Sequence, residues 1–174
     1  MKPSADYLVL DDDALLAQCR VDTFRVSGPG GQHRNRTDTA VRLTHEPSAV
    51  TAQASERRSQ LQNRQQALRR LRIAIAHEVR RPVELERYTP PVELRAVLGA
   101  PKSKRLGPRH ADYPRGVQRF LDLFVAVDAV VNEAAERAGV STGALSRFIQ
   151  ADPPLLVHCN ALRKERGLRP LRGR

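Results

Sequence analysis

The sequence predicts an α+β protein, with a small β-sheet packed on a long helix, then a proline-rich basic connector and a small α-helical unit. Three patterns support this prediction. Residues 21–26, 39–45 and 50–54 carry the apolar and polar patterning of short strands. Residues 56–79 place apolar side chains at i, i+3 and i+4 spacing, which is typical of an amphipathic helix. From residue 117 onward the apolar spacing is helical again.

The first strand follows a short helix, which we expect over residues 11–19. Acidic side chains at the start of that segment suit the positive end of a helix dipole. Ser55 is expected to cap the long helix, although Arg58 stands where a complete capping box has glutamate. The predicted core face of the long helix consists of Leu61, Ala67, Leu68, Leu71, Ile75 and Val79.

Composition divides the chain into three predicted segments. Residues 1–80 form the α+β domain. Residues 81–116 contain six prolines and a basic run from Lys102 to Arg109, so we expect a connector that is extended or mobile outside a short helix over residues 92–98. Residues 117–174 form the helical unit and end in a basic tail.

The helical unit is predicted to hold three helices. The first runs from Val117 to Ala138 and ends at Gly139, because glycine is typical of the position after a helix C-cap. Ser141 is the expected N-cap of the second helix, and Pro153 lies near the start of the third. The first two helices and their glycine turn resemble a helix-turn-helix. Two interpretations stay open: a segment that contacts nucleic acid, and an ordinary helical packing module.

Positive charge is concentrated in the middle of the chain. The formal net charge is +11, and residues 57–119 hold 16 basic and 5 acidic side chains, which equals the whole excess. Such a segment is an electrostatic footprint for nucleic acid. Exposed-type aromatic residues are few in it, so the pattern favours nucleic acid over an anionic membrane surface.

The remaining composition argues against a metal site and against export. Cys19 and Cys159 lie far apart without ligand spacing, which indicates reduced thiols. No apolar run reaches transmembrane length, and the N-terminus is acidic where a targeting segment would be basic. We therefore expect a cytoplasmic protein that needs no metal and no cofactor.

A glycine-rich loop between the first two strands is the principal candidate for chemistry. Gly28, Gly30 and Gly31 surround Pro29 and precede Gln32. Glycine tolerates positive φ and lets the backbone approach a ligand closely, so we expect Gln32 at the tip of a loop with exposed N–H groups. A Gly-Gly-Gln triplet alone is also compatible with an ordinary hairpin turn, and the longer string around it is more specific.

That longer string resembles the catalytic loop of the bacterial class I peptide-chain release factors and their short ribosome-rescue relatives. The matching residues are Arg25, Ser27, Gly28, Gly30, Gly31, Gln32, His33, Asn35, Thr37, Asp38, Ala40, Val41, Arg42 and Leu43. A second block at the start of the long helix matches with Glu56, Arg57, Ser59, Gln60, Asn63 and Ala67. The resemblance covers roughly residues 10 to 80.

The resemblance implies hydrolysis of the ester between a nascent peptide and the tRNA 3′ end, with peptidyl-tRNA in the P site of the ribosome. Gly30, Gly31 and Gln32 would be the catalytic residues, because a fixed Gln32 N–H can stabilise charge on the reacting oxygens. The family glutamine is often N-methylated, so a glutamine methyltransferase is an expected partner. The expected supporting residues of the loop are Gly28, His33, Asn35, Thr37 and Asp38.

Basic side chains near the loop and in the connector are the expected RNA contacts: Arg25, Arg34, Arg36, Arg57, Arg64, Lys102, Lys104 and Arg105. Full-length release factors also carry a codon-reading domain, and the short rescue relatives carry a basic C-terminal tail. Here a connector and a helical unit follow instead. We therefore expect codon-independent peptide release by a monomer, in translation termination or ribosome rescue. The alternative is a non-catalytic protein that binds ribosomal or other RNA through its C-terminal helices.

Overall fold

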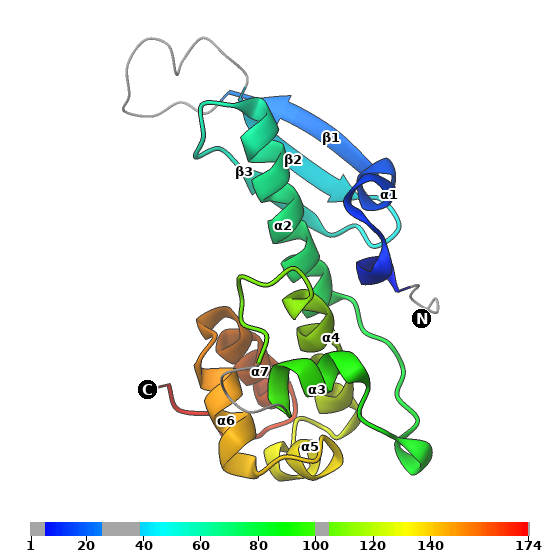
Figure 1. The fold of residues 1–174 in the computed structure, drawn as a ribbon. Coiled ribbons are helices and arrows are strands. Elements are labelled where there is room, and N and C mark those ends of the chain that lie inside the picture. Colours follow the sequence, from blue (N-terminus) through cyan, green and yellow to red (C-terminus); the bar gives the residue numbers. More distant parts are fainter. Residues whose placement is uncertain (1–5, 26–38, 100–104, 174) are drawn as a thin grey trace. The chain divides into compact units, whose positions relative to one another are not determined.

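The computed structural model describes residues 6–25, 39–99 and 105–173. These residues belong to two compact units, one ending at Glu78 and the other beginning at Val79. The first unit combines a three-stranded antiparallel sheet with helices, and the second unit is helical (Figure 1). The α+β prediction is confirmed.

The sheet of the first unit has the order β1 (Cys19–Phe24), β2 (Ala40–His45) and β3 (Thr51–Ala54). Both pairs are antiparallel, with Phe24 opposite Ala40 and Val41 opposite Ala54. The central strand β2 buries Ala40, Val41 and Leu43 almost completely. β2 lies between the other two strands and packs against α2, which explains why it is more apolar than β1.

Helix α2 (Gln60–Glu78) packs on β2 and β3 (Figure 1). Its buried side chains are Asn63, Ala67, Leu68, Leu71, Ile75 and Ala76. They confirm the core of the predicted apolar face, but Leu61 was assigned to it wrongly, since its side chain is 65% exposed. Leu61 lies about 200° of helical rotation from Asn63, on the opposite side of the helix.

The start of α2 also differs from the prediction, because Ser59 rather than Ser55 caps the helix. The Ser59 hydroxyl accepts a hydrogen bond from Gln62 N at 3.4 Å, and the Ser59 carbonyl accepts one from Asn63 N at 3.0 Å. Residues before Ser59 form a bend instead of a helical turn. The polar contacts of Asn63 described below account for that bend.

Two short elements precede the sheet, η1 (Tyr7–Val9) and α1 (Asp12–Ala17). The Asp11 carboxylate caps α1 by accepting from Ala14 N at 2.8 Å. Arg72 of α2 fastens this region, donating through Nη2 to Asp12 Oδ1 at 2.7 Å and to Leu10 O at 2.8 Å. This arginine therefore serves the fold of the first unit.

His45, at the end of β2, is a fully buried histidine with both ring nitrogens occupied. Nε2 lies 3.0 Å from Gln18 Oε1 and Nδ1 lies 2.7 Å from Ser48 Oγ. A neutral ring that donates from Nε2 and accepts at Nδ1 satisfies both contacts. Burial lowers the pKa of His45, in agreement with a neutral ring.

The second unit consists of η2 (Leu85–Arg87), α3 (Val92–Leu98), α4 (Tyr113–Ala126), α5 (Val131–Arg137), α6 (Thr142–Gln150) and α7 (Pro153–Glu165). The predicted helix ends are confirmed at three places. Gly139 has a φ of 70° after α5. Ser141 Oγ accepts from Ala144 N at 3.2 Å, and Asp152 Oδ1 accepts from Leu155 N at 3.2 Å.

The short helix predicted over residues 92–98 is confirmed as α3, and the described part of residues 81–116 lies in the same compact unit as the helices that follow it. Leu94 and Leu98 of α3 are fully buried, and α3 packs on α4 within the second unit. Two prolines of this segment mark the starts of helices. Pro91 is the N-cap residue of α3, and Pro114 lies in the first turn of α4.

The packing of α3 on α4 depends on Gly116. A Cβ at this position would lie 2.5 Å from Cγ1 of Val97 and 2.8 Å from the carbonyl oxygen of Glu93. Both distances are shorter than van der Waals contact, so the observed approach of the two helices requires glycine.

The predicted helix from Val117 to Ala138 is in fact two helices. Asp128 and Ala129 have φ angles of 51° and 59° and reverse the chain. Asp128 N donates to Val125 O at 3.1 Å, and Ala129 N donates to Phe124 O at 2.8 Å. These are the two hydrogen bonds of a Schellman C-cap. Glycine usually occupies the left-handed position, so an aspartate there gave no signal of a helix end.

Candidate active site and loop anchor

Most of the predicted active-site residues lie outside the described residues. They are Gly28, Gly30, Gly31, Gln32, His33, Asn35, Thr37 and Asp38, together with the basic residues Arg34, Arg36, Lys102 and Lys104. The structure does describe the residues on either side of the glycine-rich segment, and it shows what fixes them.

The segment between β1 and β2 begins and ends at neighbouring positions of the sheet. Phe24 is the last residue of β1 and pairs with Ala40, the first residue of β2. The Arg42 guanidinium lies over the Phe24 ring, 5.2 Å from its centroid. The same guanidinium donates from Nη2 to Gln53 Oε1 at 3.2 Å. These contacts link all three strands close to where the segment leaves the sheet.

Asn63 anchors the C-terminal end of that segment. Its side chain is fully buried and makes three hydrogen bonds, which we call the Asn63 clamp. Nδ2 donates to Thr39 O at 2.6 Å and to Arg57 O at 2.9 Å, while Oδ1 accepts from Arg57 N at 2.9 Å. The clamp therefore joins three places: the residue before β2, the bend before α2, and α2 itself.

Arg70 holds the same bend from the side of β3. Its Nη2 lies 2.7 Å from Glu56 Oε1, and its Nη1 donates to Gln53 O at 2.7 Å. The hydrogen bond from Arg70 is the largest cause of the lowered pKa of Glu56. This arginine, like Arg72, is thus engaged in contacts of the first unit.

The described basic candidates fall on both units. Arg25, Arg57 and Arg64 are exposed on the first unit, and Arg105 is half-buried in the second. Arg57 and Arg64 make no side-chain ion pair within the described ranges, so they remain candidate phosphate contacts.

Asp122 is the most perturbed carboxylate of the second unit. It is 4% exposed. Its Oδ1 accepts from Arg80 Nη1 at 3.1 Å and from the backbone N of Arg81 at 3.0 Å. Burial nevertheless raises the pKa of Asp122 to about 6, against the opposing pull of these donors. The carboxylate of Asp122 therefore anchors Arg80 and Arg81 to α4.

Neither a metal centre nor a membrane span is found in the described ranges. No cluster of three or more His, Cys, Asp or Glu side chains there could bind a metal ion. No helix among the described residues is both long and apolar enough to cross a membrane.

Sequence reasoning counted Asn63 only as part of a matching block and gave it no role. A signal was present, because Asn63 is a polar residue four positions before Ala67 on an otherwise apolar helix face. A polar side chain in a buried stripe must find hydrogen-bond partners. The sequence did not say which backbone groups those partners would be.

The chain matches known proteins over this region. Residues 14–96 match the family model described as the RF-1 domain. Peptide chain release factor 2 of Acidithiobacillus ferrooxidans is 36% identical over 149 residues, covering 83% of this chain and 38% of the relative. Peptide chain release factor 1 of Rickettsia bellii is 36% identical over 136 residues, covering 76% and 34%. That of Rickettsia africae is 50% identical over 68 residues, covering 39% and 19%.

The fold and the anchor define an α+β protein in which a glycine-rich segment begins and ends at one end of a small sheet, braced by a buried asparagine. The comparisons give this class its family: the chain is a class I release-factor-like protein with an RF-1 domain over residues 14–96. The chain spans less than two fifths of the length of these relatives. The RF-1 match continues past residue 80, where the resemblance in the sequence ended, and into α3.

Proposed function

We propose that this protein acts on the ribosome in translation termination and hydrolyses the ester of peptidyl-tRNA through Gly30, Gly31 and Gln32. One observation carries the proposal: the RF-1 match over residues 14–96 contains both the glycine-rich segment and the Asn63 clamp. The relatives named above are peptide chain release factors, and their activity is here extended to a shorter chain.

The chemistry needs a precisely placed backbone group more than an acid or a base. Attack of water on the ester builds negative charge on the carbonyl oxygen and then on the departing ribose oxygen. A Gln32 N–H held beside these oxygens stabilises that charge. The glycines at 30 and 31 allow the backbone to approach without a Cβ clash. The Asn63 clamp supports the proposal because it fixes Thr39, at which the segment ends.

Peptide release measured on ribosome complexes tests this mechanism. Gly31→Ala should abolish release with nearly unchanged ribosome binding, and Gln32→Ala should reduce release less because its N–H remains. If the Gly31→Ala protein released peptide at the wild-type rate, the alternative of a non-catalytic RNA-binding protein would replace the proposal.

We further propose that release is independent of a codon, as in ribosome rescue. The RF-1 match is followed in this chain by α4 to α7, and residues 105–108 together with α4 and α6 line a basic cleft. Equal release from complexes with an empty A site and with a sense or stop codon would support this extension. Release only with a stop codon would contradict it and leave the hydrolysis proposal intact.

Modification of Gln32 is a separate proposal. An added methyl group on the peptide that contains Gln32, found by mass spectrometry of protein purified from its own cells, would indicate a glutamine methyltransferase as partner. An unmodified peptide from such a preparation would contradict it. Sedimentation of the purified protein would test the expected monomer.

A further inference from the structure

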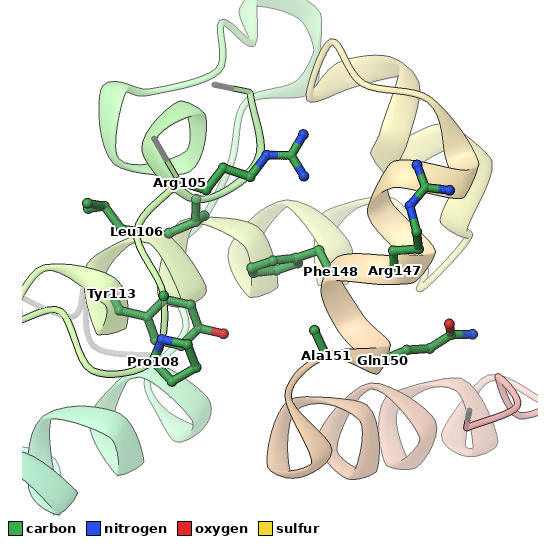
Figure 2. A pocket seen from close by; sticks show the side chains of 10 residues that line it. Arg105, Leu106, Pro108, Tyr113, Arg147, Phe148, Gln150 and Ala151 are labelled. Atoms are coloured by element: carbon green, nitrogen blue, oxygen red, sulfur yellow. The ribbon is translucent and has the colours of Figure 1, made fainter. Parts of the chain in front are cut away.

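A cleft on the second unit combines an apolar floor with two arginines. It has a volume of about 410 Å³, which lies within the range of small-molecule and nucleotide sites. One wall is the segment around Leu106, and the other is the C-terminal end of α6 (Figure 2). Leu106 N donates to Ala96 O at 3.0 Å, which fastens the first wall to α3.

Phe148 forms the apolar floor as part of an aromatic cluster. Its ring meets Phe120 edge-on at 5.5 Å between centroids and lies 6.4 Å from Tyr113. Phe120 is fully buried, whereas Phe148 is half-buried and faces the cleft (Figure 2). Tyr113 is fixed from behind, because its hydroxyl donates to Asp152 Oδ2 at 2.8 Å. The cluster therefore supports a half-buried ring that lines the cleft.

The two arginines give the cleft a charged end. Figure 2 shows the guanidinium groups of Arg105 and Arg147 at the same end of the cleft, one from each wall. Arg147 is exposed and, within the described ranges, makes no side-chain hydrogen bond or ion pair. No acidic side chain is among the described residues that line the cleft.

We propose that this cleft binds one nucleotide of single-stranded RNA, with the base stacked on Phe148 and the phosphate between Arg105 and Arg147. An aromatic ring beside a positively charged groove is the usual arrangement for binding unpaired nucleotides. The whole chain carries a net charge of +11, which suits an anionic partner. The proposed function enters only in the choice of RNA as the partner, since the ribosome exposes many unpaired nucleotides.

An acidic peptide is the other partner that two arginines could attract. The half-buried aromatic floor favours the nucleotide, because a base covers a ring face while an acidic side chain does not. The test below treats peptide binding as an outcome that overturns the proposal.

The experiment measures binding of the full-length protein to a fluorescent single-stranded oligouridylate and to an abasic strand with the same phosphates. Phe148→Leu should weaken oligouridylate binding about tenfold and leave binding of the abasic strand unchanged. Arg147→Gln should weaken both and lower the slope of log affinity against log salt by about 0.7. Arg95→Gln is the matched control, because Arg95 is exposed on α3 and does not line the cleft.

The results separate the possibilities. The proposal is overturned if Phe148→Leu weakens binding of the oligouridylate and of the abasic strand equally. It is also overturned if Arg147→Gln weakens binding no more than Arg95→Gln does. An acidic peptide that competes at Arg147 while the oligouridylate does not would overturn it as well. Arg147→Gln changes an exposed side chain, so it keeps the test valid even if Phe148→Leu lowers stability. Gly31→Ala should bind RNA as the wild type does, which separates a failure of the cleft from a failure of the proposed catalysis.

Discussion

Replacing Asn63 by alanine should loosen the first unit at the base of the glycine-rich segment. The change removes three hydrogen bonds from a side chain with 0% exposure. Each such bond contributes about 1 kcal/mol net, so the direct loss is about 3 kcal/mol. Arg57 is exposed, and water can therefore solvate its released groups. We expect a total of about 2–4 kcal/mol.

Hydrogen exchange read by mass spectrometry is the suitable assay, because a chain with two compact units need not unfold in a single step. A loss of about 3 kcal/mol should speed the exchange of the most protected amides of β2 and α2 about a hundredfold. Gln62→Ala is the matched control, since Gln62 is exposed one position earlier on the same helix.

Asn63→Asp sharpens the test because it retains the shape and the bond from Arg57 N. It replaces two donated hydrogen bonds by a buried carboxylate facing the carbonyl oxygens of Thr39 and Arg57. At neutral pH the loss should equal or exceed that of Asn63→Ala, and it should shrink as the pH falls and the carboxyl group takes up a proton. The reasoning is refuted if Asn63→Ala exchanges within threefold of Gln62→Ala, or if Asn63→Asp is insensitive to pH.

Three further predictions concern burial. Gly116→Ala should destabilise the second unit by about 1–3 kcal/mol, read from the hydrogen exchange of the α3 and α4 amides, because its Cβ would overlap Val97; Gly107→Ala, with no neighbour within 4 Å, should change little, and equal effects would contradict the packing argument. The raised pKa of Asp122 means that the folded state holds this proton more tightly. The stabilisation from protonated Asp122 should therefore fall by up to about 3 kcal/mol as the pH rises from 4 to 6. Asp122→Asn should remove that component of the pH dependence. His45 has a lowered pKa, so its ring should titrate by NMR below 6.5, and the first unit should lose stability as the pH falls through that range; a midpoint at or above 6.5 would be contrary to the neutral buried ring.

Local chemistry explains which elements could be predicted from the sequence. The alternation of apolar and polar residues in β3, the N-cap residue Ser141, Pro153 at the start of α7 and Gly139 after α5 are local signals. Their consequences are therefore visible in a short window of sequence, and the structure has them where the pattern indicated. The glycine-rich string and its family were also legible from the sequence, and the RF-1 match bears the family out.

Contacts between distant segments could not be predicted in this way. The Schellman cap places Asp128 and Ala129 at positive φ, a conformation that residues other than glycine adopt infrequently, so the local sequence did not indicate it. Residues 81–116 looked like a spacer because proline content describes local stiffness, whereas the burial of Leu94 depends on α4.

The sequence by itself determined the fold class, the family and the identity of the segment proposed to carry the chemistry. Only the tertiary structure decided that Asn63 reaches Thr39 across 24 positions of sequence, and that Arg105 and Arg147 meet at one cleft. The physical reason is the same in both cases. A hydrogen bond or a shared cleft depends on the positions of two segments in space, and those positions follow from packing of the whole unit rather than from either segment alone.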